Sequence, residues 1–260
     1  SGGYGLKGDW REAGPTAACM PKTGKAGGCS TNAAGRMMTL PQTIKAFAFD
    51  AYGTVFDFHG AVTRHRAAAG PDAEAFSQLW RQKHLEYAWT RTLMGRYVDF
   101  WTLTQQSLDY CFARFPSVPG TLRQSLLDAY FRLDAFADAA PLLNRLQQAG
   151  LRCVLFTNGT PAMAQAAAES AGLAPYFETI VSVDEIGAFK SVPEVYGLLH
   201  SRLGLNRGEI ALVSSNRWDV AGGVSYGMPA VWANRTGQPD EYADLPPTLT
   251  VTSLAEINLS

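Results

Sequence analysis

The chain has 260 residues, of which 47% are hydrophobic and 17% are charged, and its formal net charge is −1. These values are typical of a globular protein that buries a full core, and they argue against the basic surface that nucleic-acid binding requires. No apolar run approaches the roughly 20 residues that cross a bilayer, so no membrane segment is expected. The four cysteines and four histidines lack metal-ligand spacing. They predict neither a zinc site nor a disulfide framework, which favours a reducing, cytoplasmic location.

Residues 1–43 differ in composition from the rest of the chain. They are rich in glycine and show no periodic apolar pattern. Segments of low hydrophobicity cannot bury enough apolar surface to fold. The sequence therefore predicts a disordered or loosely ordered N-terminal extension.

Short apolar runs alternate with helical patterns from residue 44 onward. The predicted strands span 44–49, 151–156, 179–183, 210–213 and 229–232. Runs of this length that are rich in Val, Ile and Phe are typical of buried parallel strands, and helical stretches at 161–171 and 193–203 lie between them. This alternation predicts an α/β fold built on a doubly wound parallel sheet.

The first two predicted strands are separated by a segment much longer than one crossover helix. Three amphipathic helices are predicted within it, at 73–93, 101–115 and 122–133. Such an insertion predicts a helical cap domain over the carboxyl edge of the sheet. The expected division is a core domain of residues 44–57 and 134–260 and a cap domain of residues 58–133.

Polar residues close the predicted strands. Asp50, Thr157, Asn158, Ser214 and Asn216 each follow an apolar run. Taken singly, each is typical of a turn or a helix cap. Because ligands of open α/β sheets bind beyond the carboxyl ends of the strands, their joint position favours a functional site.

Four motifs carry a resemblance to a known family. Residues 49–57 (Phe-Asp-Ala-Tyr-Gly-Thr-Val-Phe-Asp) resemble the first motif of the haloacid dehalogenase superfamily. Residues 157–159 (Thr-Asn-Gly), Lys190 and residues 214–219 (Ser-Ser-Asn-Arg-Trp-Asp) resemble the second, third and fourth motifs, in the same order. The resemblance implies a Rossmann-like core.

Two further segments resemble one branch of that superfamily, the L-2-haloacid dehalogenases, also called type II haloacid dehalogenases. They are residues 80–87 and 94–100 in the predicted cap, and the whole resemblance covers residues 44–257. It implies hydrolysis of short (S)-2-haloalkanoic acids to (R)-2-hydroxyalkanoic acids, with inversion, through a covalent aspartyl ester. It implies no cofactor, no metal and a homodimer. The apolar side chains of Trp80, Trp89, Leu93 and Trp101 on the cap helices are compatible with a dimer interface.

Two positions favour this branch over the related phosphatases. Tyr52 stands where phosphatases carry a second Asp that protonates the leaving group, and a halide leaves without a proton. Ser215 stands where they carry an acidic ligand for Mg²⁺. A Mg²⁺-dependent phosphatase and a non-catalytic binding protein remain the alternatives. The presence of Asp50, Lys190 and Asp219 argues against the second of these.

The resemblance also implies roles for the catalytic residues. Asp50 is the expected nucleophile, and Lys190 is expected to keep it ionised. Thr54 and Ser214 are expected to hydrogen-bond to Asp50. Asn216 and Asp219, with Lys190, are expected to orient the water that hydrolyses the ester.

The remaining expected site residues contact the substrate. Thr157 and the backbone near Ala51 and Tyr52 are expected to hold its carboxylate. Arg81, Asn158 and Trp218 are expected to receive the halide. The expected lining of the pocket is Tyr52, Gln82, Leu85, Phe100 and Trp218, and Tyr196 is expected to form a hydrogen bond within the site. Taken alone, Arg81 is typical of a solvated helix surface and Phe100 of an ordinary core. The family has Ser at the position of Thr157 and Pro at that of Ser191.

Overall fold

The computed structural model describes residues 39–258 of the chain. Residues 1–38 of the expected N-terminal extension therefore lie outside the described residues. None of the helices in the described part is both long and apolar enough to cross a membrane.

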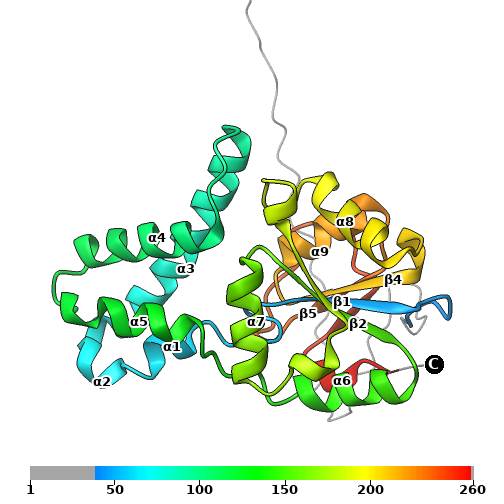
Figure 1. The fold of residues 1–260 in the computed structure, drawn as a ribbon, viewed down its shortest axis with the longest axis horizontal. Helices are drawn as coiled ribbons and strands as arrows, with labels where there is room; N and C mark the ends of the chain where they lie inside the picture. Colours follow the sequence, from blue (N-terminus) through cyan, green and yellow to red (C-terminus); the bar gives the residue numbers. More distant parts are fainter. Residues whose placement is uncertain (1–38, 259–260) are drawn as a thin grey trace, which may run out of the picture.

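The described chain forms one parallel sheet of six strands in the order β3-β2-β1-β4-β5-β6 (Figure 1). The strands are β1 (Ala46–Asp50), β2 (Arg152–Thr157), β3 (Thr179–Ser182), β4 (Ile210–Ser214), β5 (Ala230–Ala233) and β6 (Leu249–Val251). All five predicted strands are confirmed. The sixth was missed because β6 has three residues, too few to show a periodic pattern.

The strand order has its topological switch point between β1 and β4, in the middle of the sheet. From β1 the chain builds outward through β2 and β3 on one side, and through β4, β5 and β6 on the other. A ligand crevice forms at such a switch point, beyond the carboxyl ends of the strands. Asp50, Thr157 and Ser214 are the last residues of β1, β2 and β4, so one edge carries all three.

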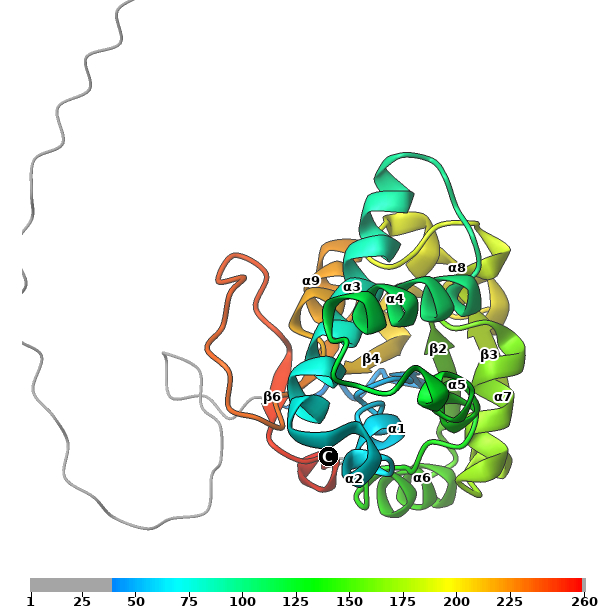
Figure 2. The same ribbon diagram turned by 90° about the vertical axis from the view of Figure 1, so that its left-hand side faces the viewer.

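Helices form a separate lobe and also flank the sheet (Figures 1 and 2). The lobe contains α1 (Gly60–Thr63), α2 (Arg66–Ala69), α3 (Ala73–Leu93), α4 (Phe100–Arg114) and α5 (Arg123–Tyr130). The sheet is flanked by α6 (Ala139–Gln148), α7 (Pro161–Ser170), α8 (Pro193–Leu203) and α9 (Arg217–Tyr226). In Figure 1, α8 and α9 lie above the sheet and α6 lies below it.

Local sequence signals explain where several helices begin and end. Asp99 caps α4, because its carboxylate accepts a hydrogen bond from the backbone N of Thr102 at 2.9 Å. Pro193 starts α8, and Gly204 ends it with a φ of 64°, a conformation that glycine adopts without strain. The observed bounds of α3 and α8 match the predicted ones.

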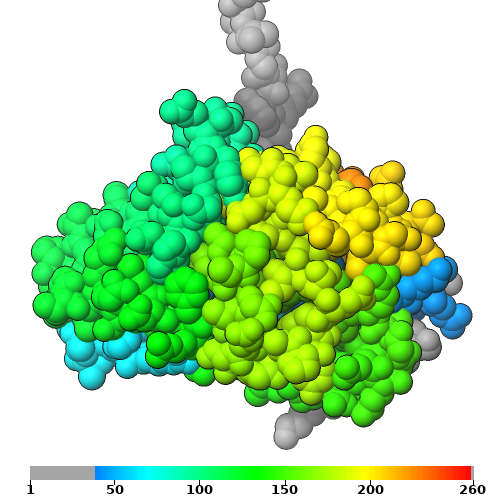
Figure 3. Space-filling model, viewed as in Figure 1, coloured from blue at the N-terminus to red at the C-terminus, as the bar shows by residue number. Residues whose placement is uncertain are grey.

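The helical lobe contacts the segment that carries Lys190. The hydroxyl of Thr92 on α3 accepts a hydrogen bond from the backbone N of Phe189 at 3.1 Å. The Tyr97 ring lies 4.9 Å from the Phe189 ring, and its hydroxyl donates to Asp184. The space-filling view shows the lobe and this part of the core in continuous contact (Figure 3). The lobe thus lies where the cap was expected, and its bounds of 58–133 remain a prediction.

Candidate active site

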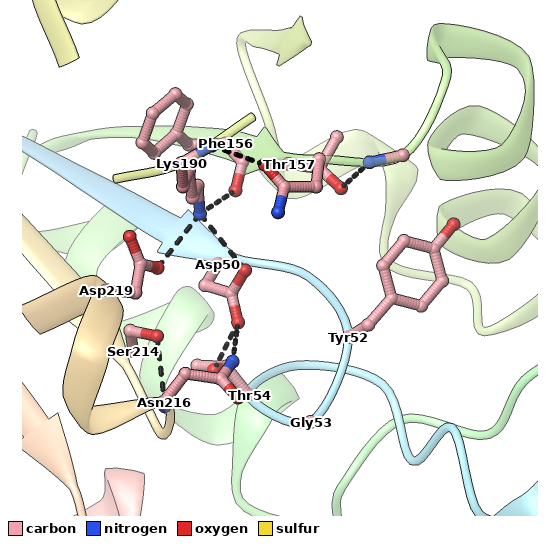
Figure 4. Close-up of polar contacts among 12 residues, drawn as sticks. Asp50, Tyr52, Gly53, Thr54, Phe156, Thr157, Lys190, Ser214, Asn216 and Asp219 are labelled. Carbon is pink, nitrogen blue, oxygen red and sulfur yellow. Dashed lines mark hydrogen bonds and ion pairs between the residues drawn. The ribbon is translucent and has the colours of Figure 1, made fainter. Parts of the chain in front are cut away.

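The Lys190 ammonium is the centre of the site (Figure 4). Its Nζ donates to Asp50 Oδ1 at 3.1 Å, to Asp219 Oδ2 at 2.9 Å and to the Phe156 carbonyl at 3.0 Å. Its side chain is fully buried. Because an ammonium has three N–H donors, all of them are used. One buried cation therefore bridges two carboxylates.

The charges of this cluster stabilise one another. Burial lowers the pKa of Lys190, but the charges of Asp219 and Asp50 outweigh that effect, and the pKa stands above its ordinary value. Burial raises the pKa of Asp219, and Lys190 offsets part of the rise. Lys190 accordingly stays charged at neutral pH.

Two further side chains donate to the other oxygen of Asp50. Thr54 Oγ1 lies 2.9 Å and Asn216 Nδ2 lies 2.8 Å from Asp50 Oδ2. Thr54 reaches it because the chain turns back after β1 at Gly53, whose φ of 93° is strained for other residues. Three donors thus fix the orientation of the Asp50 carboxylate, as predicted for Lys190 and Thr54.

Ser215 contacts the Thr54 hydroxyl. The backbone N of Ser215 donates to Thr54 Oγ1 at 2.8 Å, the two hydroxyl oxygens lie 3.1 Å apart, and the Ser215 hydroxyl donates to the Gly53 carbonyl at 2.7 Å. These contacts hold Thr54 Oγ1 beside Asp50. Sequence reasoning noted Ser215 only as a missing acid and did not find this contact.

Ser214 does not contact Asp50 as expected. Within the described residues its hydroxyl accepts a hydrogen bond from the backbone N of Asn216 at 3.1 Å. The residue ends β4 and orders the first turn after it, so its side chain is used locally. The predicted hydrogen bond from Ser214 to Asp50 is wrong.

Tyr196 and Asp219 form a buried pair behind Lys190. The Tyr196 hydroxyl lies 2.9 Å from Asp219 Oδ1, which confirms that Tyr196 forms a hydrogen bond in this cluster. Lys190 and Tyr196 thus contact one oxygen each of the Asp219 carboxylate. A Cβ at Gly222 would lie 2.2 Å from the Tyr196 hydroxyl, so only glycine leaves it room. The role of Asp219 in orienting water remains a prediction.

Arg81 reaches from α3 into the edge of the sheet. Its Nη2 lies 3.2 Å from Asn216 Oδ1 and 3.5 Å from the Tyr52 carbonyl, and its guanidinium lies 4.6 Å from the Phe58 ring centroid. Arg81 is therefore half-buried beside Asn216 and Tyr52, and its halide-binding role remains a prediction. Asn216 links it to Asp50.

The other expected halide ligands lie elsewhere around this centre. Asn158 Oδ1 accepts the backbone N–H of Lys190 at 3.0 Å, so the residue holds the lysine segment. The Lys190–Ser191 peptide bond there is cis. The Trp218 ring packs edge-on against Trp89 of the lobe, 5.4 Å between centroids. A halide-binding role for Asn158 and Trp218 remains a prediction.

Thr157 and Tyr52 lie on one side of the centre (Figure 4). Thr157 Oγ1 accepts the backbone N–H of Gly159 at 2.9 Å. A Cβ at Gly159 would come within 2.8 Å of the Tyr52 ring. Within the described residues the Tyr52 hydroxyl is buried without a hydrogen-bond partner. Both hydroxyls thus lie beside Gly159, and carboxylate binding by Thr157 and the backbone near Tyr52 remains a prediction.

Aromatic rings form the wall behind Tyr52. Its ring lies 6.0 Å from Phe100 and 5.7 Å from Tyr130, and His84 stacks on Phe100 at 4.7 Å. Burial lowers the pKa of His84 well below its ordinary value, so this histidine is neutral. Sequence reasoning missed His84 and Tyr130, because nothing in their local pattern distinguishes them from core residues.

Two expected lining residues are less enclosed. Gln82 is exposed on α3, outside the buried centre, and Leu85 is half-buried. Ala51 is fully buried after β1, and its carbonyl accepts the backbone N–H groups of Val55 and Phe56. The substrate contacts of these residues remain predictions.

Comparison with known proteins identifies the family. The model of the haloacid dehalogenase-like hydrolases matches residues 44–227. The chain belongs to the haloacid dehalogenase-like hydrolase family. It is 42% identical to (S)-2-haloacid dehalogenase 1 of Pseudomonas sp. (strain CBS-3) over 82% of this chain and 95% of that protein. It is 40% identical to (S)-2-haloacid dehalogenase 4A of Burkholderia cepacia over 84% of this chain and 95% of that protein.

Solved structures of haloacid dehalogenases have the same fold. The L-2-haloacid dehalogenase from Xanthobacter autotrophicus with chloropropionic acid covalently bound is 34% identical, with a TM-score of 0.74 over 82% of this chain and 96% of that one. A crystal structure described as a dehalogenase with intermediate complex is 40% identical, with a TM-score of 0.81 over 84% and 96%. The family assignment and the fold expected from the four motifs are both confirmed.

Proposed function

We propose that this haloacid dehalogenase-like hydrolase converts short (S)-2-haloalkanoic acids to (R)-2-hydroxyalkanoic acids through an ester of Asp50. The observation that carries the proposal is the Asp50 carboxylate, which Lys190, Thr54 and Asn216 hold at the end of β1. Two relatives named (S)-2-haloacid dehalogenase support it, as does the structure of an L-2-haloacid dehalogenase with chloropropionic acid covalently bound.

The first step is a displacement at C2 of the substrate. One oxygen of Asp50 forms a bond to C2 while the bond from C2 to the halogen breaks, and the halide takes the electron pair. The Arg81 guanidinium stabilises the negative charge that develops on the halide. Attack from the side opposite the halide inverts C2.

The second step restores Asp50. Water adds to the ester carbonyl carbon, and the bond from that carbon to the alkyl oxygen breaks. One proton of the water goes to the departing hydroxy acid and the other to solvent, and the water oxygen stays on Asp50. Asp219, Asn216 and Lys190 are proposed to orient this water, and C2 is not touched.

The substrate contacts follow from the residues around Asp50. Thr157 and the backbone N–H groups near Ala51 and Tyr52 are proposed to bind the carboxylate. The alkyl chain is proposed to lie against Tyr52 and Phe100, whose rings are buried, with Leu85, Gln82 and Trp218 farther out. This aromatic wall suits short apolar chains.

The two alternatives do not match the groups that the site contains. A phosphatase needs an acid two residues after the nucleophile, where the buried Tyr52 stands. Burial, followed by the charges of Tyr130 and Asp50, raises the pKa of its phenol. Ser215 replaces the acidic Mg²⁺ ligand and donates to the Gly53 carbonyl. A non-catalytic binding protein has no use for two carboxylates buried around a lysine, because burying charge is costly.

A homodimer and a cytoplasmic location complete the proposal. Leu93 and Met94, at the end of α3, are 86% and 62% exposed and offer an apolar contact surface. Trp80 does not contribute to such a surface, because its side chain is 2% exposed and its indole N–H donates to the Thr104 carbonyl.

An oxygen-labelling experiment tests the covalent mechanism. With enzyme in excess over (S)-2-chloropropanoate in ¹⁸O-labelled water, mass spectrometry should find unlabelled (R)-lactate and label on Asp50. The reason is that the first lactate oxygen comes from the carboxylate. Over many turnovers the lactate should become labelled.

The opposite pattern contradicts the covalent route. Labelled lactate in the first turnover with unlabelled Asp50 would mean that water attacks C2 directly. A matched run with EDTA should release halide at the same rate. Release of phosphate from p-nitrophenyl phosphate that depends on Mg²⁺ would favour the phosphatase instead.

Replacing Arg81 tests the halide site. Arg81→Ala should slow alkylation of Asp50 by about 100-fold and weaken substrate binding much less, because halide charge develops in the transition state. Single-turnover halide release measures the first quantity. Arg91→Ala, on the same helix, is the control, since Arg91 contacts Gln106 and the Arg96 carbonyl. Equal rates in the two variants would remove Arg81 from the mechanism.

A further inference from the structure

Arg235, two residues after β5, joins segments that are far apart in the sequence. Its Nη1 donates to Asp138 Oδ2 at 2.7 Å and its Nη2 donates to Asp138 Oδ1 at 2.9 Å. This is the two-pronged guanidinium–carboxylate geometry that fixes orientation as well as distance. The two side chains are 18% and 14% exposed. The pair is therefore a partly buried, rigid connection.

Asp138 is itself anchored. Its Oδ2 also accepts from the Ser253 hydroxyl at 2.7 Å and from the backbone N of Leu254 at 2.8 Å. Burial raises the pKa of this carboxyl, but the hydrogen bonds from Arg235, Ser253 and Leu254 outweigh burial and lower it. The carboxylate is a fixed negative charge at the start of α6.

The same guanidinium holds the turn after the proposed nucleophile. Arg235 Nη2 donates to the Thr54 carbonyl at 2.9 Å, while the Thr54 hydroxyl donates to Asp50 at 2.9 Å. The backbone N of Phe136 donates to the Val55 carbonyl at 2.9 Å, and the guanidinium lies 4.1 Å from the Phe136 ring centroid. Arg235 is therefore separated from the reacting carboxylate by a single residue.

We infer that Arg235, held by Asp138, is a positioning residue for the dehalogenation proposed above. It fixes the main chain of Thr54 so that the Thr54 hydroxyl meets Asp50. Arg235 has no hydrogen bond or ion pair to Asp50, and it acts through Thr54. A lysine at this position keeps the charge but cannot form the fork to Asp138 and reach the Thr54 carbonyl together.

A double-mutant cycle tests this inference. The variants are Arg235→Lys, Thr54→Val and the two combined, and the readout is the single-turnover rate of Asp50 alkylation. Arg235→Lys should lower that rate about tenfold with little change in KM, because the nucleophile is misplaced. Thr54→Val keeps the carbonyl and removes the hydroxyl. The combined variant should be no slower than Thr54→Val alone, since nothing remains to be positioned.

The controls separate positioning from folding. Arg145→Ala removes an arginine that donates to the Ala255 and Ile257 carbonyls, in the same C-terminal segment that anchors Asp138. It should lower Tm without changing the alkylation rate. If Arg235→Lys does not fold, Asp138→Asn replaces it in the cycle with the same expected result.

The outcomes distinguish this inference from the proposed function. If the wild-type chain releases halide but the two substitutions multiply in their effects on rate, Arg235 is merely structural and the inference fails alone. If the wild-type chain releases no halide from 2-haloacids, the proposed function fails and the inference fails with it.

Discussion

Asp50→Asn should abolish halide release while the fold is kept. An amide cannot displace the halide, so we expect a fall of about 10⁴-fold or more in the alkylation rate. The change is nearly isosteric, so Tm should change much less than activity does. Halide release and covalent labelling of the protein by (S)-2-chloropropanoate, followed by mass spectrometry, measure the effect.

The neighbouring Asp57 provides the control for this variant. Asp57 follows the turn after β1, and its carboxylate accepts the backbone N–H of His59 at 3.0 Å and is not part of the Lys190 cluster. Asp57→Asn should keep close to wild-type activity. Activity above a few per cent in Asp50→Asn, without deamidation back to Asp, would show that Asp50 is not the nucleophile.

Lys190→Met should cost both activity and stability. Removing the ammonium leaves two buried carboxylates without their shared cation, which typically costs about 3–5 kcal/mol. We expect alkylation to slow by at least about 100-fold, because Asp50 loses its main electrostatic partner. Denaturant unfolding and single-turnover halide release measure the two effects.

The pH dependence of the free energy of unfolding shows whether the loss of stability in Lys190→Met is electrostatic. Without Lys190 the pKa of Asp219 in the folded protein rises further above its unfolded value. The folded state then binds more protons than the unfolded state, so the free energy of unfolding falls as the pH rises between these two pKa values. Lys190→Met should therefore lose stability with rising pH over a wider range than the wild type.

An exposed lysine serves as the matched control. Lys45 pairs with Glu209 at 2.5 Å, and its side chain is 61% exposed. Water and salt screen such a pair, and Lys45 lowers the pKa of Glu209 on the acid side only. Lys45→Met should therefore keep the wild-type pH dependence from neutral pH upward. If the stability of Lys190→Met depends on pH as that of the wild type does, the electrostatic account of the Lys190 cluster is wrong.

The parts of the fold that sequence alone predicted are those with strong local signals. The core strands show as continuous apolar runs, and α8 is marked by Pro193 at its start and Gly204 after its end. The four-residue helices α1 and α2 were missed, as was β6, because such short elements have no readable period. Tertiary contacts, not local preference, hold them in place.

The strand ends and the family motifs predicted the central residues of the candidate site. They identified Asp50, Lys190, Thr54, Asn216 and Asp219, which the structure brings together. Sequence could not show that the backbone N–H of Ser215 donates to the Thr54 hydroxyl, or that Arg235 holds the Thr54 carbonyl. Those hydrogen bonds join residues 161 and 181 positions apart, and nothing local encodes them.

The hydrogen bond between Thr92 and Phe189 ties the helical lobe to the lysine segment. Phe189 directly precedes Lys190, so this lobe contact lies one residue from the proposed cation of the site. Lys190 itself is held from the core by Asp50, Asp219, the Phe156 carbonyl and Asn158. The segment that carries the lysine is therefore fixed from two sides, by the sheet and by the helical lobe.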